Sequence, residues 1–252
     1  MQRINLTNEI RYDLLSFNIN RDNINNGGNI NIAILDTGID TIYDNICQCI
    51  NFSSTDRTNW IDRTGHGTFV YHIIAGYDMI KGFANRANIY IVKVLDNNRH
   101  GTVHWLIRGI EWCIDNNIDV VNISLGFKEG SNALHNICKT AYMKNITLIA
   151  AAGNKESIEY PAIYDEVFCV KDINSTMPIQ KSFVLAADGK NVISAIGRDQ
   201  YAVDSGSSFS TAKVTGAIAA VQSYMKRKYG CRMTNEELID FMKNNMNYFN
   251  NL

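Results

Sequence analysis

The alternation of short apolar runs with longer helical patterns constrains this chain more than any other feature. The runs have the length of buried strands and are rich in isoleucine and valine, and the longer segments repeat apolar residues at spacings of three and four. We expect strands at residues 29–36, 89–95, 119–125, 146–152, 166–173 and 191–196. We expect helices at residues 66–76, 102–117, 134–144 and 210–229, and one from Thr234 with Glu237 completing a capping box. This alternation predicts an α/β fold, a three-layer sandwich with a mainly parallel central sheet.

The length and composition are those of one sizeable globular domain. The chain has 252 residues, of which 46% are hydrophobic and 19% charged. We expect a single domain over residues 1–252, with residues 1–28 as an N-terminal extension packing on it and residues 40–64 as an irregular connection. The net charge of −1 offers no electrostatic attraction to nucleic acid or to a membrane surface. No apolar run reaches the roughly eighteen residues of a membrane-spanning helix.

The cysteines and the N-terminal residues bear on the compartment. Six cysteines are scattered through the chain, mostly among apolar neighbours, which is typical of buried free thiols. Cys47 and Cys49 are too close for a usual disulfide, and no second pair stands at metal-binding spacing, so a metal site there is the minor alternative. The first ten residues contain no apolar signal core, so we expect a cytoplasmic protein, or a secreted one if a leader was removed.

Three segments carry the residue types of nucleophilic catalysis. Asp36 is expected at the carboxyl end of the first strand, where ligands gather in open parallel sheets. His66 is expected to begin a helix, within a Gly-His-Gly-Thr motif. Ser208 stands in a Gly-Ser-Ser motif at the start of the last long helix, beside its free backbone N–H groups. A serine hydroxyl is a weak nucleophile that needs a base within hydrogen-bond reach, and the base needs an orienting partner.

These motifs resemble those of the subtilisin-like serine proteases, the subtilases, whose chain order is also Asp, His, Ser. The similarity runs from about residue 30 to about residue 229, through segments 92–95, 109–112, 122–126 and 150–154. It implies a subtilisin-like fold and a serine endopeptidase that acts on peptides or proteins through an acyl-enzyme. In the resemblance Ser208 is the nucleophile, His66 the general base and then acid, and Asp36 the group that orients the imidazole. Asn154 would donate its side-chain NH₂ to the oxyanion, beside the N–H of Ser208.

Each of the four residues also has an ordinary structural interpretation. Asp36 could be a turn former before a glycine, and His66 the first residue of a helix. Ser208 could be a helix cap, and Asn154 a left-handed residue after a glycine. We prefer the catalytic interpretation because all of them occur together, in the family's order.

The resemblance also implies a substrate site. An extended substrate would pair between backbone segments 99–101 and 124–126. Glu159 falls where the family often has glycine, and a carboxylate there could favour a basic side chain beside the scissile bond; Lys155 could neutralise it or point outward, and a solvated loop residue is the alternative. The resemblance places the first specificity pocket between segments 124–126 and 151–153. An apolar pocket farther from the cut would be lined by Val103 and Leu106. The expected substrate-binding residues are Gly101, Val103, Leu106, Ser124, Leu125, Gly126, Ala152, Gly153 and Glu159.

The chain departs from the family pattern in several places. Ser207 stands where threonine is usual, residues 209–213 replace Met-Ala-Ser-Pro-His, and Phe69 and His72 replace a histidine and a glycine. The connection from His66 to Val92 is shorter than in calcium-binding relatives, which argues against the family's high-affinity calcium loop and leaves a structural calcium ion as the minor alternative. The chemistry itself requires no cofactor or metal. We expect no folding propeptide within residues 1–252, which leaves open a propeptide or inhibitor that acts in trans.

Other functions are possible for such a sequence. A catalytically inactive subtilase-like module that only binds peptides is the main alternative, and the complete set of four polar residues argues against it. An α/β-hydrolase elbow would need glycine where Ser210 stands, and its triad has a different order. A dinucleotide enzyme would need a G-x-G-x-x-G motif after the first strand, and none is present.

Overall fold

The computed structural model describes residues 27–77, 80–154, 158–198 and 200–245. Within them, seven parallel strands form one sheet in the order β2-β3-β1-β4-β5-β6-β7. The strands are β1 (Asn31–Asp36), β2 (Ile46–Asn51), β3 (Asn88–Lys93), β4 (Val120–Ile123), β5 (Thr147–Ala151), β6 (Phe168–Asp172) and β7 (Val184–Ala187). The order runs from β1 through β4, β5, β6 and β7 on one side, and through β3 to the edge strand β2 on the other. Parallel neighbours need crossover connections, and helices make those from β2 to β3, from β3 to β4 and from β4 to β5.

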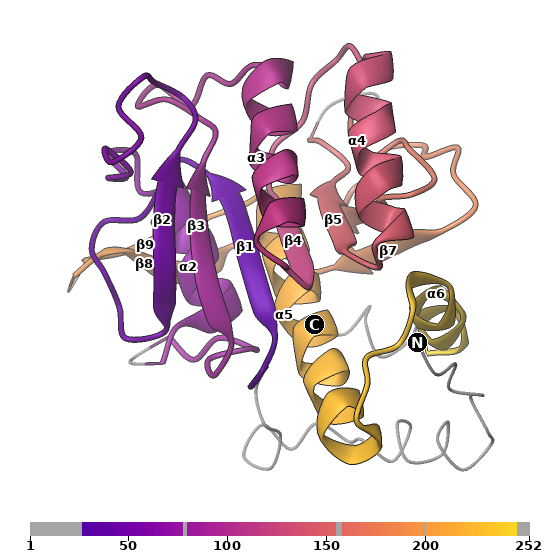
Figure 1. The fold of residues 1–252 in the computed structure, drawn as a ribbon. Coiled ribbons are helices and arrows are strands. Elements are labelled where there is room, and N and C mark those ends of the chain that lie inside the picture. The colour runs from indigo at the N-terminus through magenta and orange to yellow at the C-terminus, as the bar shows by residue number, and fades with distance from the viewer. Residues whose placement is uncertain (1–26, 78–79, 155–157, 199, 246–252) are drawn as a thin grey trace.

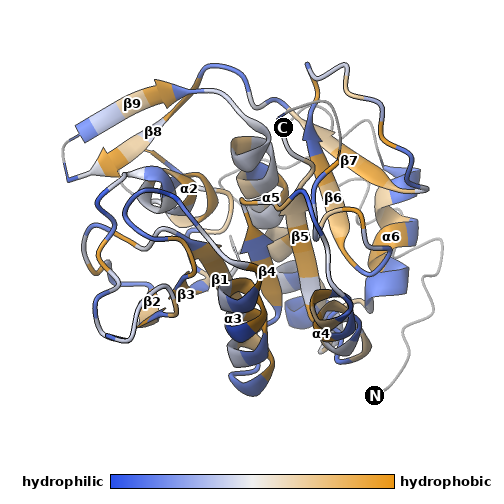
Figure 2. Cartoon of the chain, turned by 90° about the horizontal axis from the view of Figure 1, so that it is seen from above, coloured by the Kyte–Doolittle hydropathy of each residue, from blue (hydrophilic) through white to orange (hydrophobic). Residues whose placement is uncertain are grey.

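Helices cover both faces of the sheet (Figure 1). The helices are α2 (His66–Ala75), α3 (Val103–Asp115), α4 (Asn132–Met143), α5 (Ser207–Tyr229) and α6 (Asn235–Asn244). Helices α3 and α4 lie side by side on one face, and α2 and α5 lie on the other. Seen from above, hydrophobic residues are concentrated in the strands between the helices (Figure 2). The predicted α/β class with a mainly parallel sheet is confirmed.

The alternation of side chains along β1 produces two separate cores. Ile32 and Ile34 belong to the core under α2 and α5, together with residues of α6. Ala33 and Leu35 belong to the core under α3 and α4. Because successive side chains of a strand point to opposite faces, a strand that is apolar at every position fits only a sheet covered on both sides.

The helix ends explain where the structure places the polar motifs. Helix α6 begins with the predicted capping box, in which Thr234 and Glu237 each bond the other's backbone N–H. Helix α5 begins at Ser207, three residues earlier than predicted. The hydroxylated residues form the first turn, in which the Thr211 hydroxyl donates to the Ser207 carbonyl at 2.7 Å. Ser208 therefore lies inside that first turn.

Several element predictions were wrong. Residues 40–64 contain the edge strand β2, which the sequence obscures because the strand is half exposed and bulged between Ile46 and Gln48. The short strand β7 was missed. The strand predicted at residues 191–196 is present as β8 (Val192–Gly197), but it pairs antiparallel with the missed strand β9 (Gln200–Asp204) outside the main sheet. Short, half-exposed strands give weak periodicity, so tertiary pairing decides them.

Two further expectations concern the whole chain. Residues 1–26 lie outside the described residues, so the expected packing of the N-terminal extension and the single-domain assignment stay predictions. In the described part of the chain, every helix is too short or too polar to cross a membrane.

Candidate active site

Asp36 and His66 meet at the carboxyl edge of the sheet. Asp36 is the last residue of β1 and is fully buried, and His66 is the first residue of α2. The His66 Nδ1 lies 2.7 Å from Asp36 Oδ1, which also accepts the backbone N–H of Thr37 at 2.7 Å. Gly65, with φ of 78°, makes the left-handed turn that starts the helix beside the strand. The contact leaves the other ring nitrogen of His66 available to a second partner.

Opposing effects act on the His66 imidazole. Burial lowers its pKa, but the attraction of the Asp36 carboxylate and the hydrogen bond to it raise the pKa by more. The positive charge of Arg99 lowers the pKa of His66, and the negative charge of Asp62 raises it. The net result is a pKa above the ordinary histidine value of 6.5. The imidazole is therefore a stronger base than an isolated histidine.

Asp62 ties the aspartate and histidine segments together, and the sequence reasoning missed it. Its Oδ1 accepts from the Thr37 hydroxyl, the Thr64 N–H and hydroxyl, and the Gly65 N–H, all at 2.9 to 3.0 Å. Its Oδ2 accepts from the N–H and hydroxyl of Thr68 at 3.0 and 2.9 Å. Burial raises the pKa of Asp62, but these hydrogen bonds lower it by more, so the net pKa is below normal. The sequence did offer one signal for Asp62, since it is a carboxylate only four residues before His66.

Lys93 places a positive charge near the two buried carboxylates, Asp36 and Asp62. It ends β3 next to Asp36 in the sheet register and is 3% exposed. Its ammonium donates to the Thr37 carbonyl and, at 3.2 Å, to Asn97 Oδ1. Burial lowers the pKa of Lys93, while Asp62 and Asp36 oppose that effect. The cation offsets part of the cost of burying two carboxylates.

Ser208 faces Ser124, the residue that follows β4. The Ser208 hydroxyl donates to the Ser124 carbonyl, and the Ser124 hydroxyl donates to the Ser208 carbonyl, both at 3.0 Å. Asn122 donates to the Ser124 hydroxyl at 2.9 Å and accepts from the Thr215 hydroxyl at 3.0 Å. This buried chain of hydrogen bonds joins β4 to α5 and holds the backbone at Ser208.

His66 and Ser208 border the same region. The His66 ring lies 5.9 Å, centroid to centroid, from the ring of Phe209, the neighbour of Ser208. His66 also lines a groove of about 530 Å³ together with Ser124, whose carbonyl binds the Ser208 hydroxyl. In this arrangement the hydroxyl is directed to Ser124, and rotation about its Cα–Cβ bond would redirect it.

Asn154 stands three residues beyond the end of β5 with its amide held from one side. Its Oδ1 accepts the Ser207 N–H at 2.8 Å. A Cβ placed on Gly206 would lie 3.4 Å from Asn154 Nδ2, so the amide sits directly against the backbone before α5. The side chain is exposed, so its NH₂ group can donate to a ligand.

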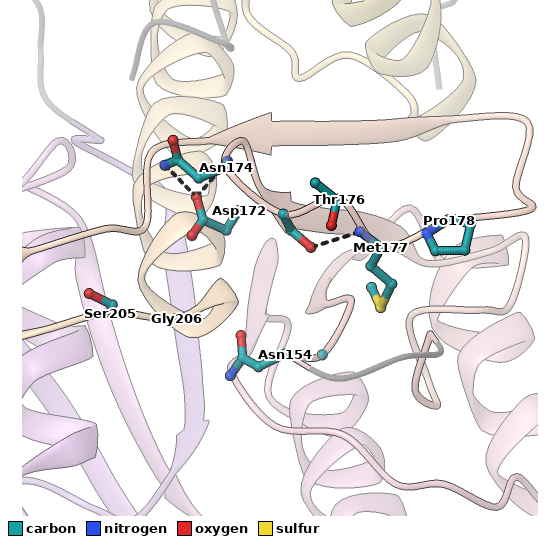
Figure 3. A pocket seen from close by; sticks show the side chains of 10 residues that line it. Asn154, Asp172, Asn174, Thr176, Met177, Pro178, Ser205 and Gly206 are labelled. Carbon is teal, nitrogen blue, oxygen red and sulfur yellow. Dashed lines mark hydrogen bonds between the residues drawn. The ribbon is translucent and has the colours of Figure 1, made fainter.

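A second pocket, of about 680 Å³, also borders Asn154 (Figure 3). Asn154, Ser205 and Gly206 lie on one side of it, and Asp172 at its upper wall accepts two hydrogen bonds from Asn174, each at 3.0 Å. The sequence reasoning did not predict this pocket, because half or more of its lining comes from residues 172–178 at the end of β6 and in the loop after it, which carry no recognisable motif.

The groove contains part of the expected substrate site. It is lined by His66, Leu95, Arg99, His100, Gly101, Ser124, Leu125, Gly126 and Phe127. Val103 is partly buried against the core under α3, and Ala152 and Gly153 are buried. The expectation for Leu106 is wrong: its side chain is 0% exposed and packs in the core. Helical spacing marks an apolar face, but it does not distinguish a core residue from a pocket residue.

Metal-binding side chains do not gather in the described residues: no group of three or more His, Cys, Asp or Glu could hold an ion there. The six cysteines are free thiols. Three are buried as expected, but Cys47 is exposed, and Cys49 and Cys231 are half-buried. The exposure at Cys47 and Cys49 follows from their place on the edge strand β2.

Comparison with known proteins agrees with the fold and the edge geometry. A model of the subtilase family matches residues 27–251. Subtilisin NAT of Bacillus subtilis subsp. natto is 34% identical over 214 residues, 78% of this chain and 56% of that protein. The major intracellular serine protease of Bacillus subtilis is 31% identical over 236 residues, 84% and 74% respectively. The minor extracellular protease Epr of the same species is 35% identical over 236 residues, 87% and 35%. The chain belongs to the subtilase family, and it spans about half the length of subtilisin NAT and of subtilisin E.

The hydrogen bonds to Asp62 predict that its charge stabilises the fold in a pH-dependent way. Because its folded pKa is depressed, its contribution is present above the unfolded value, about 4, and is lost as the pH falls. We expect Asp62→Asn to lower the free energy of unfolding at pH 7 by about 2 kcal/mol or more, since several donors lose an anionic acceptor. The loss should shrink as the pH falls below about 4.

Urea unfolding of Asp62→Asn in the Ser208→Ala background, at a series of pH values, measures this without interference from self-cleavage. Asp44→Asn, which removes an exposed carboxylate before β2, is the matched control and should leave stability nearly unchanged. Equal stability of the Asp62 and Asp44 variants at pH 7 would contradict the assigned role.

Proposed function

We propose that this chain is a serine endopeptidase that hydrolyses peptide bonds through an acyl-enzyme. The observation that carries the proposal is the 2.7 Å contact between Asp36 and His66. His66 lines a groove that Ser124 also lines, and the Ser124 carbonyl accepts the Ser208 hydroxyl. A buried carboxylate bound to a histidine of raised pKa is the arrangement that activates a hydroxyl. Membership in the subtilase family supports the same assignment.

The first half of the reaction forms the acyl-enzyme. The Asp36 carboxylate accepts the Nδ1–H of His66, which fixes the tautomer in which Nε2 is the base. Ser208 turns from the Ser124 carbonyl toward Nε2 and attacks the substrate carbonyl while its proton passes to His66. The imidazolium, stabilised by Asp36, then gives this proton to the leaving amine as the peptide C–N bond breaks. In the second half, His66 deprotonates a water that attacks the ester, and Ser208 leaves with the proton.

The start of α5 supplies the environment for the oxyanion. The N–H groups of a helix's first turn lack intrahelical partners, and the helix dipole places partial positive charge there. We assign the Ser208 N–H and the Asn154 NH₂ as the two donors. Ser207 N–H, bound to Asn154 Oδ1, orients the amide so that its NH₂ is free to face the substrate.

We further propose that the substrate binds as an added strand along the groove. Segments 99–101 and 124–126 form two of its walls and carry backbone groups that an extended peptide can pair with. Pairing through the backbone explains a peptide or protein substrate. The same groove would serve an inactive peptide-binding module, so a test of chemistry must separate the two.

An intracellular role in processing peptides or precursor proteins is part of the proposal. The similarity to an intracellular protease supports it, although an extracellular relative matches as well. Free thiols in all six cysteines, one of them exposed, suit a reducing compartment. Independence from cofactors, the weak case for calcium, and a propeptide or inhibitor acting in trans stay predictions.

The decisive experiment is active-site labelling. We expect a fluorophosphonate to label the folded wild-type protein at Ser208, and a peptide library to be cleaved at internal bonds. Ser208→Ala should abolish both, and Ser207→Ala, a substitution at the neighbouring hydroxyl, should retain them, because only the former removes the nucleophile. Mass spectrometry locates the label. Well-folded wild-type protein that takes no label would favour the peptide-binding module.

The raised pKa of His66 predicts the pH dependence of that labelling. Only the neutral imidazole is a base, so the rate should rise with pH through the His66 pKa, at a midpoint above 6.5. An uncharged fluorophosphonate is suitable because its own charge does not change over pH 5–9, and circular dichroism checks the fold at each pH. A midpoint at or below 6.5 would contradict the dominance of Asp36 over burial.

Asn154 is expected to act in the transition state rather than in substrate binding. Asn154→Ala should lower kcat by about 10²–10³, the loss found for the corresponding donor of a subtilisin, with KM little changed. Asn154→Asp is the matched variant, because it keeps the acceptor for the Ser207 N–H but replaces the NH₂ with an oxygen. Steady-state kinetics should show both variants slow. Recovery of kcat in Asn154→Asp would mean that the residue only positions α5.

A further inference from the structure

The Glu159 side chain occupies the space between two glycines at the edge of the sheet. A Cβ built on Gly126 would lie 2.4 Å from Glu159 Oε2, and a Cβ built on Gly153 would lie 3.0 Å from Glu159 Cδ. Gly153 also has φ of 102°, a left-handed conformation that side chains disfavour. Both glycines therefore leave room that the carboxylate of Glu159 fills, so the carboxylate contacts both backbone segments.

The backbone around Glu159 is held on both sides. Its N–H donates to the Ala152 carbonyl at 3.0 Å, beyond the end of β5. The next residue, Tyr160, exchanges two hydrogen bonds with Phe127, at 2.8 and 2.9 Å, beyond the end of β4. The segment thus bridges the extensions of the two strands. The paired backbone therefore fixes the position of Glu159 more tightly than that of a solvated loop residue.

These two extensions also lead to the reacting groups. Gly126 follows Ser124, whose carbonyl binds the Ser208 hydroxyl, and Gly153 precedes Asn154, whose amide binds the Ser207 N–H. The carboxylate therefore stands between the segment at the nucleophile and the segment at the oxyanion donor. On the function proposed above, that is where the side chain immediately before the scissile bond enters.

The charge of Glu159 is not matched by an ion pair from the described residues. Lys155, whose neutralising role was left open, lies outside the described residues. The side chain is partly exposed, so a substrate can reach it without unfolding the site. An acidic group at the wall of a narrow, partly desolvated site attracts a cation more strongly than it would in bulk water.

We propose that Glu159 selects substrates with lysine or arginine immediately before the scissile bond. This inference rests on the proposed endopeptidase function and names its substrate class. The cationic side chain enters between Gly126 and Gly153, displaces the Glu159 side chain toward its partly exposed side, and donates charge-assisted hydrogen bonds to Oε1 and Oε2. Arginine matches both oxygens with its planar fork, so it should exceed lysine. A filled pocket that admits only glycine or alanine is the competing outcome.

The test uses peptides that differ only in the residue before the scissile bond: arginine, lysine, glutamine, methionine, alanine and glycine. We expect kcat/KM for arginine and lysine to exceed that for glutamine and methionine by about 10- to 100-fold, as for a charge-assisted hydrogen bond. Glu159→Gln keeps the shape and removes the charge, so it should abolish that preference. Glu129→Gln removes an exposed carboxylate three residues after Gly126 and should not change it.

Several results would overturn the proposal. The first is a preference for alanine or glycine in both the wild type and Glu159→Gln that disappears only in Glu159→Gly. That result would mean that the residue 159 side chain fills the pocket and excludes larger substrate side chains. A basic preference that survives in Glu159→Gln would assign the selection to another acid. Each variant is first labelled with the fluorophosphonate, which shows that the site is assembled. Absence of label in the wild type would contradict the endopeptidase function itself. Labelled protein without a preference for lysine or arginine before the scissile bond would contradict only the role of Glu159.

Discussion

The shared carboxyl edge of the parallel strands is the constraint on which the rest of the site depends. Leu35 of β1 pairs with Ile123 of β4, and Ile123 pairs with Ala150 of β5. In this register the residues that follow each strand leave the sheet at one level. Asp36, Ser124 and the loop to Asn154 therefore emerge side by side, and the helices that return to the sheet deliver His66 and Ser208 to the same edge. A register shift of one residue would turn each side chain to the opposite face.

The chemistry at that edge is possible because its buried polar groups are nearly all compensated. Asp62 accepts six hydrogen bonds from the segments that carry the aspartate and histidine motifs. Lys93 supplies the opposite charge, and the chain from Thr215 to Ser208 satisfies the hydroxyls between β4 and α5. An uncompensated charge at this depth would cost several kcal/mol, so these contacts hold the site rigid as well as folded. Asp36 Oδ2 is the exception, a buried oxygen that no protein group bonds in the described structure.

The fold was predictable where local pattern and tertiary environment agree. Strand β1 is apolar at its four inner positions, residues 32–35, and therefore predicts a strand covered on both faces, as observed. Strand β2 was not predictable, because an edge strand is half exposed and its pattern is interrupted by a bulge. Leu106 shows that a recognised pattern can still leave a residue's environment undecided. Its helical spacing on α3 was recognised, but its burial in the core depends on what packs against that helix. Periodicity reports which face is apolar and says nothing of the partner.

By itself, the sequence determined the alternation of strands and helices, the α/β class and the identity of the polar residues at Asp36, His66, Asn154 and Ser208. These follow from local composition and short motifs, which can be read along the sequence without knowledge of tertiary contacts. Only the tertiary structure decided that Asp62 gathers six donors and that the Ser208 hydroxyl bonds Ser124. It also decided that the Glu159 carboxylate lies between Gly126 and Gly153. The physical reason is that each arrangement needs a residue from a distant segment: Thr37 at Asp62, Ser124 at Ser208 and Gly126 at Glu159. Sheet register and helix packing set those distances, and no local pattern encodes them.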